Sequence, residues 1–193
     1  MGTSNWQNIS YCCELIQELS PKRTLDVGVG SLGRWALIVR EFTEVWKGRV
    51  KPGSWTGTVD GIEAFAEQVT SLHANLYDTL YIGDAFEVVK NLNPYDLIIM
   101  GDVLEHFEGK KTKPMVESCL RKSKWLIVST PLGAIEEWPQ AETYGNPWEE
   151  HQAVFDLSFF LDAPEWNVLK YRLFRDCLDR EFGTFLLSGR LKT

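Results

Sequence analysis

Cysteine is scarce in this 193-residue sequence, and its spacing fits neither a metal site nor a redox motif. The four cysteines are Cys12, Cys13, Cys119 and Cys177. No pair has the C-x-x-C spacing of a zinc site or of a thioredoxin-like dithiol. Such sparse use of cysteine fits a reducing compartment, so we expect a cytoplasmic protein. Cys12 and Cys13 lie in a helical pattern and are expected to be small buried apolar side chains.

Long apolar runs are also missing. The longest apolar stretches have the length of a strand, far below the roughly 20 residues that a membrane-spanning helix needs. The first residues lack the basic start and apolar core of a signal peptide. We therefore expect no membrane partner.

Positive charge is in deficit, because 20 lysines and arginines stand against 27 acids and give a formal net charge of −7. Nucleic-acid-binding proteins neutralise phosphates with a basic face, so we expect no nucleic-acid partner. The basic run at residues 110–113 is interpreted as a solvated helix face. A hydrophobic content of 44% is ordinary for a globular protein, and the length predicts a single domain over residues 1–193.

A glycine-rich turn follows the first apolar segment, where residues 25–33 read LDVGVGSLG. Glycines between a strand and a helix let the backbone turn sharply and approach a ligand closely. Gly28, Gly30 and Gly33 match the dinucleotide-binding pattern, which by itself does not identify the cofactor. Asp26 places a carboxylate at the end of this strand.

Four further strands are predicted, over residues 55–62, 80–86, 95–107 and 124–130. Acids lie at the ends of the first two of them. Glu63 follows the second strand of the chain, and Asp84 lies at the end of the third. The carboxyl ends of parallel strands meet at one sheet edge, so these acids are expected to converge. A carboxylate there can accept hydrogen bonds from both hydroxyls of a ribose.

Helices are expected between these strands, and a hairpin is expected at the end of the chain. The predicted helices cover residues 4–19, 32–46, 64–75 and 112–122, with a short one after Asp84 and with Pro114 in a first turn. The segments 166–174 and 181–191 are joined too closely for a parallel crossover and must pair antiparallel. Alternating strands and helices predict an α/β fold.

The ordered segments DVGVGSLG, VDGIEA, IGDAF, YDLIIMGDVLEHF and WLIVSTPLG resemble class I S-adenosylmethionine (SAM)-dependent methyltransferases. The resemblance covers roughly residues 24–131 and implies a Rossmann-like, doubly wound three-layer sandwich. In that fold a mostly parallel seven-stranded sheet ends in an antiparallel C-terminal edge hairpin. The helix within residues 1–20 would lie over the cofactor pocket.

The resemblance also implies a binding site for SAM. The residues implied to hold it are Asp26, Gly28, Gly30, Glu63, Asp84, Ala85, Gly101 and Asp102. Among them, Glu63 would hold the ribose hydroxyls and Asp84 would face the adenine amino group, while Gly101 and Asp102 would lie next to the sulfonium. Leu32 stands where many members carry a third glycine.

His106 and His151 are the candidate catalytic bases, because a neutral imidazole can accept a proton near pH 7. His106 could instead hydrogen-bond the neighbouring loop and shape the pocket. Glu105, His106 and His151 could together bind a metal, but their separation in the chain is not diagnostic, so no metal site is predicted. His73 is expected to face solvent from its helix and to have no role.

The segment 132–151 is long, irregular and rich in tryptophan, proline and glutamate. We interpret it as a substrate-side lid, with a structural loop at the sheet edge as the alternative. Its acids would favour a neutral or cationic acceptor over a phosphorylated one.

The sequence thus predicts a SAM-dependent methyltransferase that acts on a small or medium-sized acceptor by direct displacement. A nicotinamide-dependent (NAD-type) Rossmann oxidoreductase and a non-catalytic SAM-binding protein are the alternatives.

Overall fold

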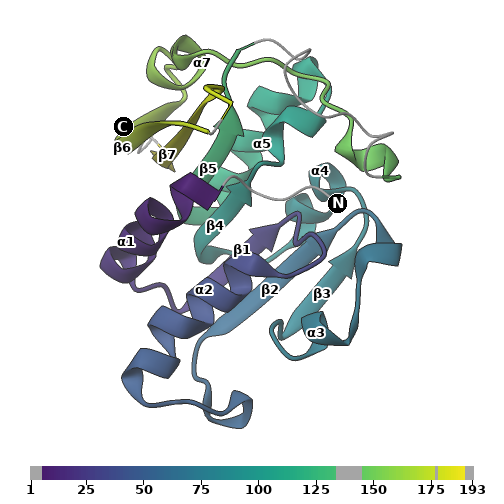
Figure 1. The fold of residues 1–193 in the computed structure, drawn as a ribbon, viewed down its shortest axis with the longest axis vertical. Helices are drawn as coiled ribbons and strands as arrows, with labels where there is room; N and C mark the ends of the chain where they lie inside the picture. The colour runs from purple at the N-terminus through teal and green to yellow at the C-terminus, as the bar shows by residue number, and fades with distance from the viewer. Residues whose placement is uncertain (1–5, 134–144, 177, 190–193) are drawn as a thin grey trace.

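The computed structural model describes residues 6–133, 145–176 and 178–189. Within these ranges one seven-stranded sheet has the order β3-β2-β1-β4-β5-β7-β6 (Figure 1). Its strands are β1 Arg23–Val27, β2 Thr58–Glu63, β3 Thr79–Ile82, β4 Tyr95–Gly101, β5 Ser123–Pro131, β6 Trp166–Arg175 and β7 Glu181–Gly189. β1 to β5 pair in parallel, and β7 pairs antiparallel with both β5 and β6. This confirms the predicted Rossmann-like sandwich and its edge hairpin.

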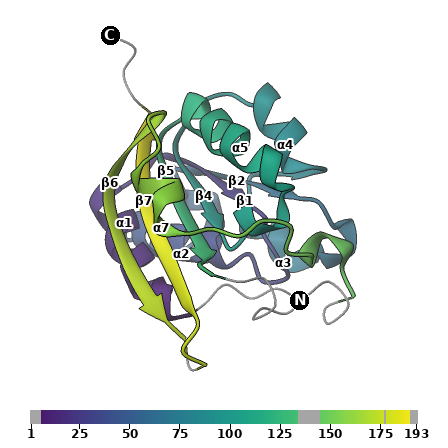
Figure 2. The same cartoon turned by 90° about the horizontal axis from the view of Figure 1, so that it is seen from above.

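Helices cover both faces of the sheet (Figure 2). One face packs against α1 (Ile9–Leu19) and α2 (Arg34–Thr43), and the other packs against α4 (Ala85–Val88), α5 (Gly109–Lys122) and α7 (Leu157–Leu161). No helix in the described ranges combines the length and the apolar character needed to cross a bilayer.

The central strand β4 shows why this sequence forms a buried parallel sheet. Leu97 and Ile99 pack on the side of α1 and α2, while Ile98 and Met100 pack on the side of α5. All four side chains are fully buried. Because both faces are covered here, the centre of the strand needs apolar residues at every position, which explains the unbroken apolar run at residues 97–100.

Three local expectations were wrong. Residues 64–75 do not form one helix; only α3, Ser71–Ala74, is α-helical there, because Thr70 is extended and caps it by accepting the N–H of Leu72. The fourth strand ends at Gly101 instead of continuing to residue 107. Helix α5 begins at Gly109, so Pro114 lies inside the helix and not in its first turn.

The described cysteines are free thiols, as expected. Cys12 and Cys119 are fully buried, and Cys13 is half-buried. Cys177 lies outside the described residues. The two buried thiols pack as apolar side chains in the two layers of the core.

Phe160 is the side chain of α7 that packs on the sheet. Its ring stacks on Phe185 of β7 at a centroid distance of 3.9 Å and is fully buried. We expect Phe160→Ala to lower the free energy of unfolding by about 3–5 kcal/mol, because it leaves a cavity in the core. Urea unfolding measures this loss. Leu169→Ala is the matched control, since Leu169 is 49% exposed and its loss should cost less than about 0.5 kcal/mol; equal losses for the two variants would contradict this packing.

Candidate functional site

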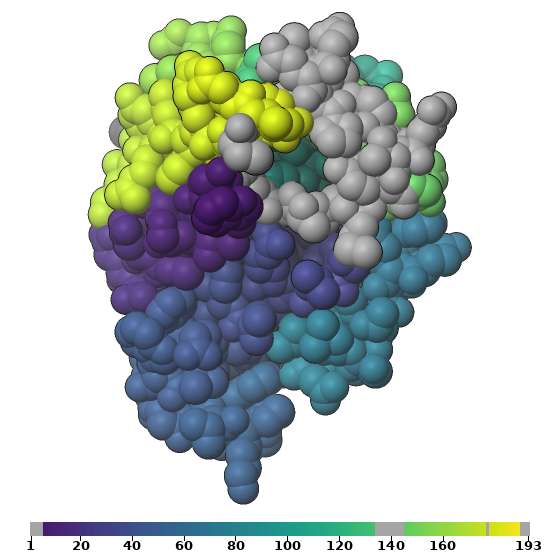
Figure 3. All heavy atoms as spheres, viewed as in Figure 1, coloured from purple at the N-terminus to yellow at the C-terminus, as the bar shows by residue number. Residues whose placement is uncertain are grey.

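A cavity of about 570 Å³ lies at the carboxyl ends of the parallel strands. Strand order reverses between β1 and β4, and open α/β sheets bind ligands at this point. The wall of the cavity includes Gly28, Gly30, Glu63, Asp84, Ala85, Gly101 and Asp102. Figure 3 shows a hollow on this side of the molecule next to the N-terminal residues, with teal atoms from the middle of the chain at its floor. The structure therefore brings seven of the eight residues implied to hold the cofactor to one cavity.

The glycine turn after β1 has a left-handed backbone at Gly28, Gly30 and Gly33, with φ of 75°, 60° and 58°. At Gly28 the side-chain space is already occupied, because an added Cβ would lie 2.5 Å from Cγ2 of Val103. The close approach at Gly28 is thus between this turn and the chain after β4. A larger residue there would disturb the fold as well as any ligand.

Glu63 at the end of β2 holds the glycine turn. Its Oε2 accepts the N–H of Gly30 at 3.0 Å, and its Oε1 accepts the N–H of Phe65 at 2.9 Å. The side chain is buried at the cavity wall, and burial raises the pKa of this carboxyl above its usual value. The same carboxylate that fixes the turn is therefore also the acceptor expected for a ribose.

Asp26 lies beneath the cavity and does not line it. Its side chain is fully buried, and Oδ2 accepts the hydroxyl of Tyr77 at 2.6 Å. Burial is the main cause that raises the pKa of Asp26 to about 7, and the nearby Glu63 adds to it. The structure therefore engages this acid with Tyr77 and with the backbone of Ala36 in α2.

The expectation that His73 faces solvent was wrong. Its side chain is 1% exposed, and its Nε2 lies 2.8 Å from the carbonyl oxygen of Gly30, to which Nε2–H donates. Its Nδ1 accepts the N–H of Thr70 at 3.0 Å. His73 therefore holds the carbonyl of the same glycine whose N–H Glu63 accepts. The capping sequence Thr70-x-x-His73 was the local signal that a helix begins here, but the contact with Gly30 is tertiary.

Asp84 and Asp102 line the cavity from the ends of β3 and β4. Asp84 caps α4 by accepting the N–H of Phe86 at 2.9 Å. Asp102 has a left-handed backbone, with φ of 55°, and its Oδ1 accepts the hydroxyl of Ser129 at 3.3 Å. Next to it, Gly101 must be glycine, because an added Cβ would lie 2.0 Å from Nε1 of Trp35.

Three side chains meet at another part of the wall: Glu105, His106 and His151. One potential ligand atom from each lies within 4.8 Å of the others, and the two rings are 4.9 Å apart at 67°. The structure therefore brings together the three residues whose spacing along the chain was not diagnostic.

Burial shifts the pKa of each of these three groups. Burial and the nearby Asp102 raise the pKa of Glu105 well above its usual value. Burial lowers the pKa of His106, and burial together with His106 lowers the pKa of His151 to about 4. Both imidazoles are consequently neutral at pH 7.

The described part of the expected lid also borders the cavity. Residues 134–144 of this segment lie outside the described residues. The cavity-lining residues beyond them are Asn146, Trp148, Glu149, His151 and Gln152. From the basic run, Lys111 lines the cavity as well, and its Nζ pairs with Glu108 at 3.1 Å.

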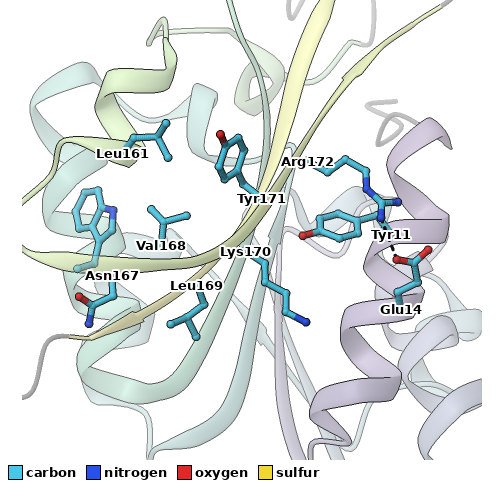
Figure 4. Close-up of a pocket in the computed structure, with 10 residues that line it drawn as sticks. Tyr11, Glu14, Leu161, Asn167, Val168, Leu169, Lys170, Tyr171 and Arg172 are labelled. Atoms are coloured by element: carbon cyan, nitrogen blue, oxygen red, sulfur yellow. Dashed lines mark hydrogen bonds and ion pairs between the residues drawn. The ribbon is translucent and has the colours of Figure 1, made fainter.

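A second cavity, of about 780 Å³, lies over β6 and α1, away from the glycine turn (Figure 4). Its charged groups pair with one another across the two elements: Arg172 with Glu14 at 3.2 Å, and Lys170 with Glu18 at 2.6 Å. A bulge interrupts the pairing of β6 between Val168 and Lys170. The site at the strand ends is therefore the stronger candidate for chemistry.

No protein-family model and no curated protein sequence matches the chain. Solved structures do share its fold. A magnesium protoporphyrin IX methyltransferase from Synechocystis, determined with bound SAM, aligns with a TM-score of 0.62 at 13% identity over 98% of this chain and 86% of that chain. An O-methyltransferase from Bacillus cereus, determined in complex with SAH, the demethylated product of SAM, aligns with a TM-score of 0.59 at 12% identity. The alignment covers 97% of this chain and 83% of that chain. A bacterial Hen1 methyltransferase domain aligns with a TM-score of 0.61 at 12% identity, over 96% of this chain and 98% of that chain. The chain therefore has the fold of the class I methyltransferases.

Asp26 makes stability depend on pH in a predictable direction. Its pKa is raised in the folded state, so the folded chain binds more protons than the unfolded chain between about pH 4 and 7. Stability due to this group is present at low pH and is lost as pH rises through about 7. We expect Asp26→Asn to gain stability relative to the wild type by up to about 1.4 kcal/mol per pH unit across this range. Urea unfolding at pH 5 and pH 8 measures the difference in free energy of unfolding between Asp26→Asn and the wild type. A difference that does not change with pH would contradict a raised pKa for this buried carboxyl.

Proposed function

We propose that this chain is a SAM-dependent methyltransferase that transfers the methyl group to a small or medium-sized acceptor by direct displacement. The charge of the cavity carries the proposal. Of the described residues that line it, seven are Asp or Glu and three are Lys or Arg. Such a wall favours a cationic sulfonium and disfavours the two phosphates of a nicotinamide dinucleotide.

The side chains at the strand ends fit the parts of SAM. Glu63 presents a buried carboxylate for the ribose hydroxyls, and Asp84 lies at the next strand end for the adenine amino group. Ala85 offers a small apolar side chain beside the ring. Gly101 and Asp102 place a close backbone and a negative charge where the sulfonium would lie.

The cofactor supplies an activated methyl group, and the protein has to align the acceptor with it. Holding the nucleophile in line with the methyl carbon turns a bimolecular reaction into an intramolecular one. A hydroxyl or ammonium acceptor must also lose a proton. His106 and His151 are neutral near pH 7 and line the same cavity, so either imidazole can receive that proton.

The proposal is tested by screening acceptors of different charge for incorporation of labelled methyl from SAM. Transfer to any acceptor supports methyltransferase activity. Binding of SAM with no transfer across the screen would favour the alternative of a non-catalytic SAM-binding protein. Binding of NAD in place of SAM would favour the oxidoreductase alternative.

Glu63→Gln tests the ribose contact. We expect the affinity for SAH to fall about 10- to 100-fold, because hydrogen bonds to a charged acceptor are worth roughly 1.5–3 kcal/mol. Isothermal titration calorimetry measures the affinity. Glu67→Gln is the matched control, since Glu67 is an exposed acid on the same segment that does not line the cavity. Equal affinity in both variants would place the ribose elsewhere.

A further inference from the structure

We propose that Glu105, His106 and His151 form a binding site for one divalent transition-metal ion on the wall of the cavity. One potential ligand atom from each side chain lies within 4.8 Å of the other two, so small side-chain rotations bring all three within reach of one ion. Two imidazole nitrogens and one carboxylate are the ligand set of many catalytic metal sites.

The backbone holds these ligands together across a long separation in the chain. The carbonyl oxygen of Glu105 accepts two hydrogen bonds from the residues that follow His151: the N–H of Gln152 at 2.8 Å and the N–H of Ala153 at 3.1 Å. The two ligand-bearing segments are thus tied at the ligand positions themselves. A metal site needs this fixed spacing before the ion arrives.

The outer contacts of the ligands also match those of metal sites. Thr130 donates its hydroxyl to Oε2 of Glu105 at 3.0 Å. Nδ1 of His106 lies 3.2 Å from the carbonyl oxygen of Glu150, and a hydrogen bond to that carbonyl places the proton on Nδ1. Nε2 of His106 then carries the lone pair that a metal needs. Ligating histidines in proteins are usually oriented through their other nitrogen in this way.

The ion pairs between described residues of the cavity wall do not involve Glu105. Glu105 is 2% exposed, and no lysine or arginine of the described residues forms an ion pair with it. Two cationic side chains on the cavity wall are engaged with other acids: Lys111 with Glu108, and Arg180 with Asp176. A divalent ion at the cluster would therefore meet no competing ion pair at Glu105 from the described residues.

A role for the ion in catalysis rests on the proposed function. Three protein ligands leave coordination positions open toward the cavity, where an acceptor hydroxyl can bind. In this arrangement His106 and His151 bind the metal and so do not receive the acceptor's proton. The metal would instead lower the pKa of the acceptor hydroxyl, and the proton would leave to water. The oxygen then forms a bond to the methyl carbon of SAM as the carbon–sulfur bond breaks, giving a methyl ether, SAH and one proton. The acceptor class is therefore a hydroxyl compound.

Metal binding is tested first without SAM, by equilibrium dialysis of the full chain against Co²⁺. We expect one equivalent to bind, and Glu105→Gln and His151→Gln to weaken binding at least about tenfold. Glu105→Gln keeps the shape of the side chain and its contact with Thr130, so it should remain folded by circular dichroism. Glu67→Gln is the control, because it removes an exposed carboxylate that does not line the cavity and should leave Co²⁺ binding unchanged. Equal binding by the wild type and both cluster variants would overturn the proposal.

Calorimetry with SAH in the presence of EDTA separates this inference from the proposed function. SAH binding that persists in EDTA, with methyl transfer to hydroxyl acceptors restored by Co²⁺ or Mn²⁺, supports both. Co²⁺ binding without SAH binding supports the metal site and contradicts the methyltransferase. Methyl transfer that is unchanged by EDTA and in His151→Gln overturns the catalytic role of the metal.

Discussion

The hydrogen bond from the N–H of Gly30 to the carboxylate of Glu63 is the interaction on which the cavity depends. It joins the turn after β1 to the end of β2, and His73 fixes the same glycine through its carbonyl. Both contacts come from residues that are almost fully buried. With the turn held on two sides, the left-handed backbone at Gly30 stays open toward the ends of the neighbouring strands.

Buried acids near this turn come at a cost in stability. Asp26, Glu63 and Glu105 each have a raised pKa whose largest cause is burial. A protein optimised only for stability would replace them with apolar residues or pair them with cations. Their concentration at one end of the sheet indicates that this end is arranged to interact with something of complementary charge.

The strands were predictable from the sequence, but the contacts between distant segments were not. The apolar run at residues 97–100 of β4 and the acids Glu63 and Asp84 at strand ends follow from local rules, so the sheet and most of the cavity wall could be predicted. The position of His73 could not, because residues 64–75 have a helical pattern that the tertiary contact with Gly30 overrides. The meeting of His106 and His151 depends on backbone pairing between segments far apart in the chain, which no local pattern encodes.

The edge strand β6 has a consequence for how copies of this molecule meet. An exposed strand edge offers unpaired backbone groups to any other strand, and sheets can grow through such edges into fibrils. Here β6 carries Lys170, Arg172 and Arg175, and the bulge after Val168 breaks its regular spacing. Two copies that approach edge to edge would crowd these charged side chains and their acidic partners, and their strands would not match in register. Strand β6, at this edge of the open sheet, is thereby protected against edge-to-edge polymerisation.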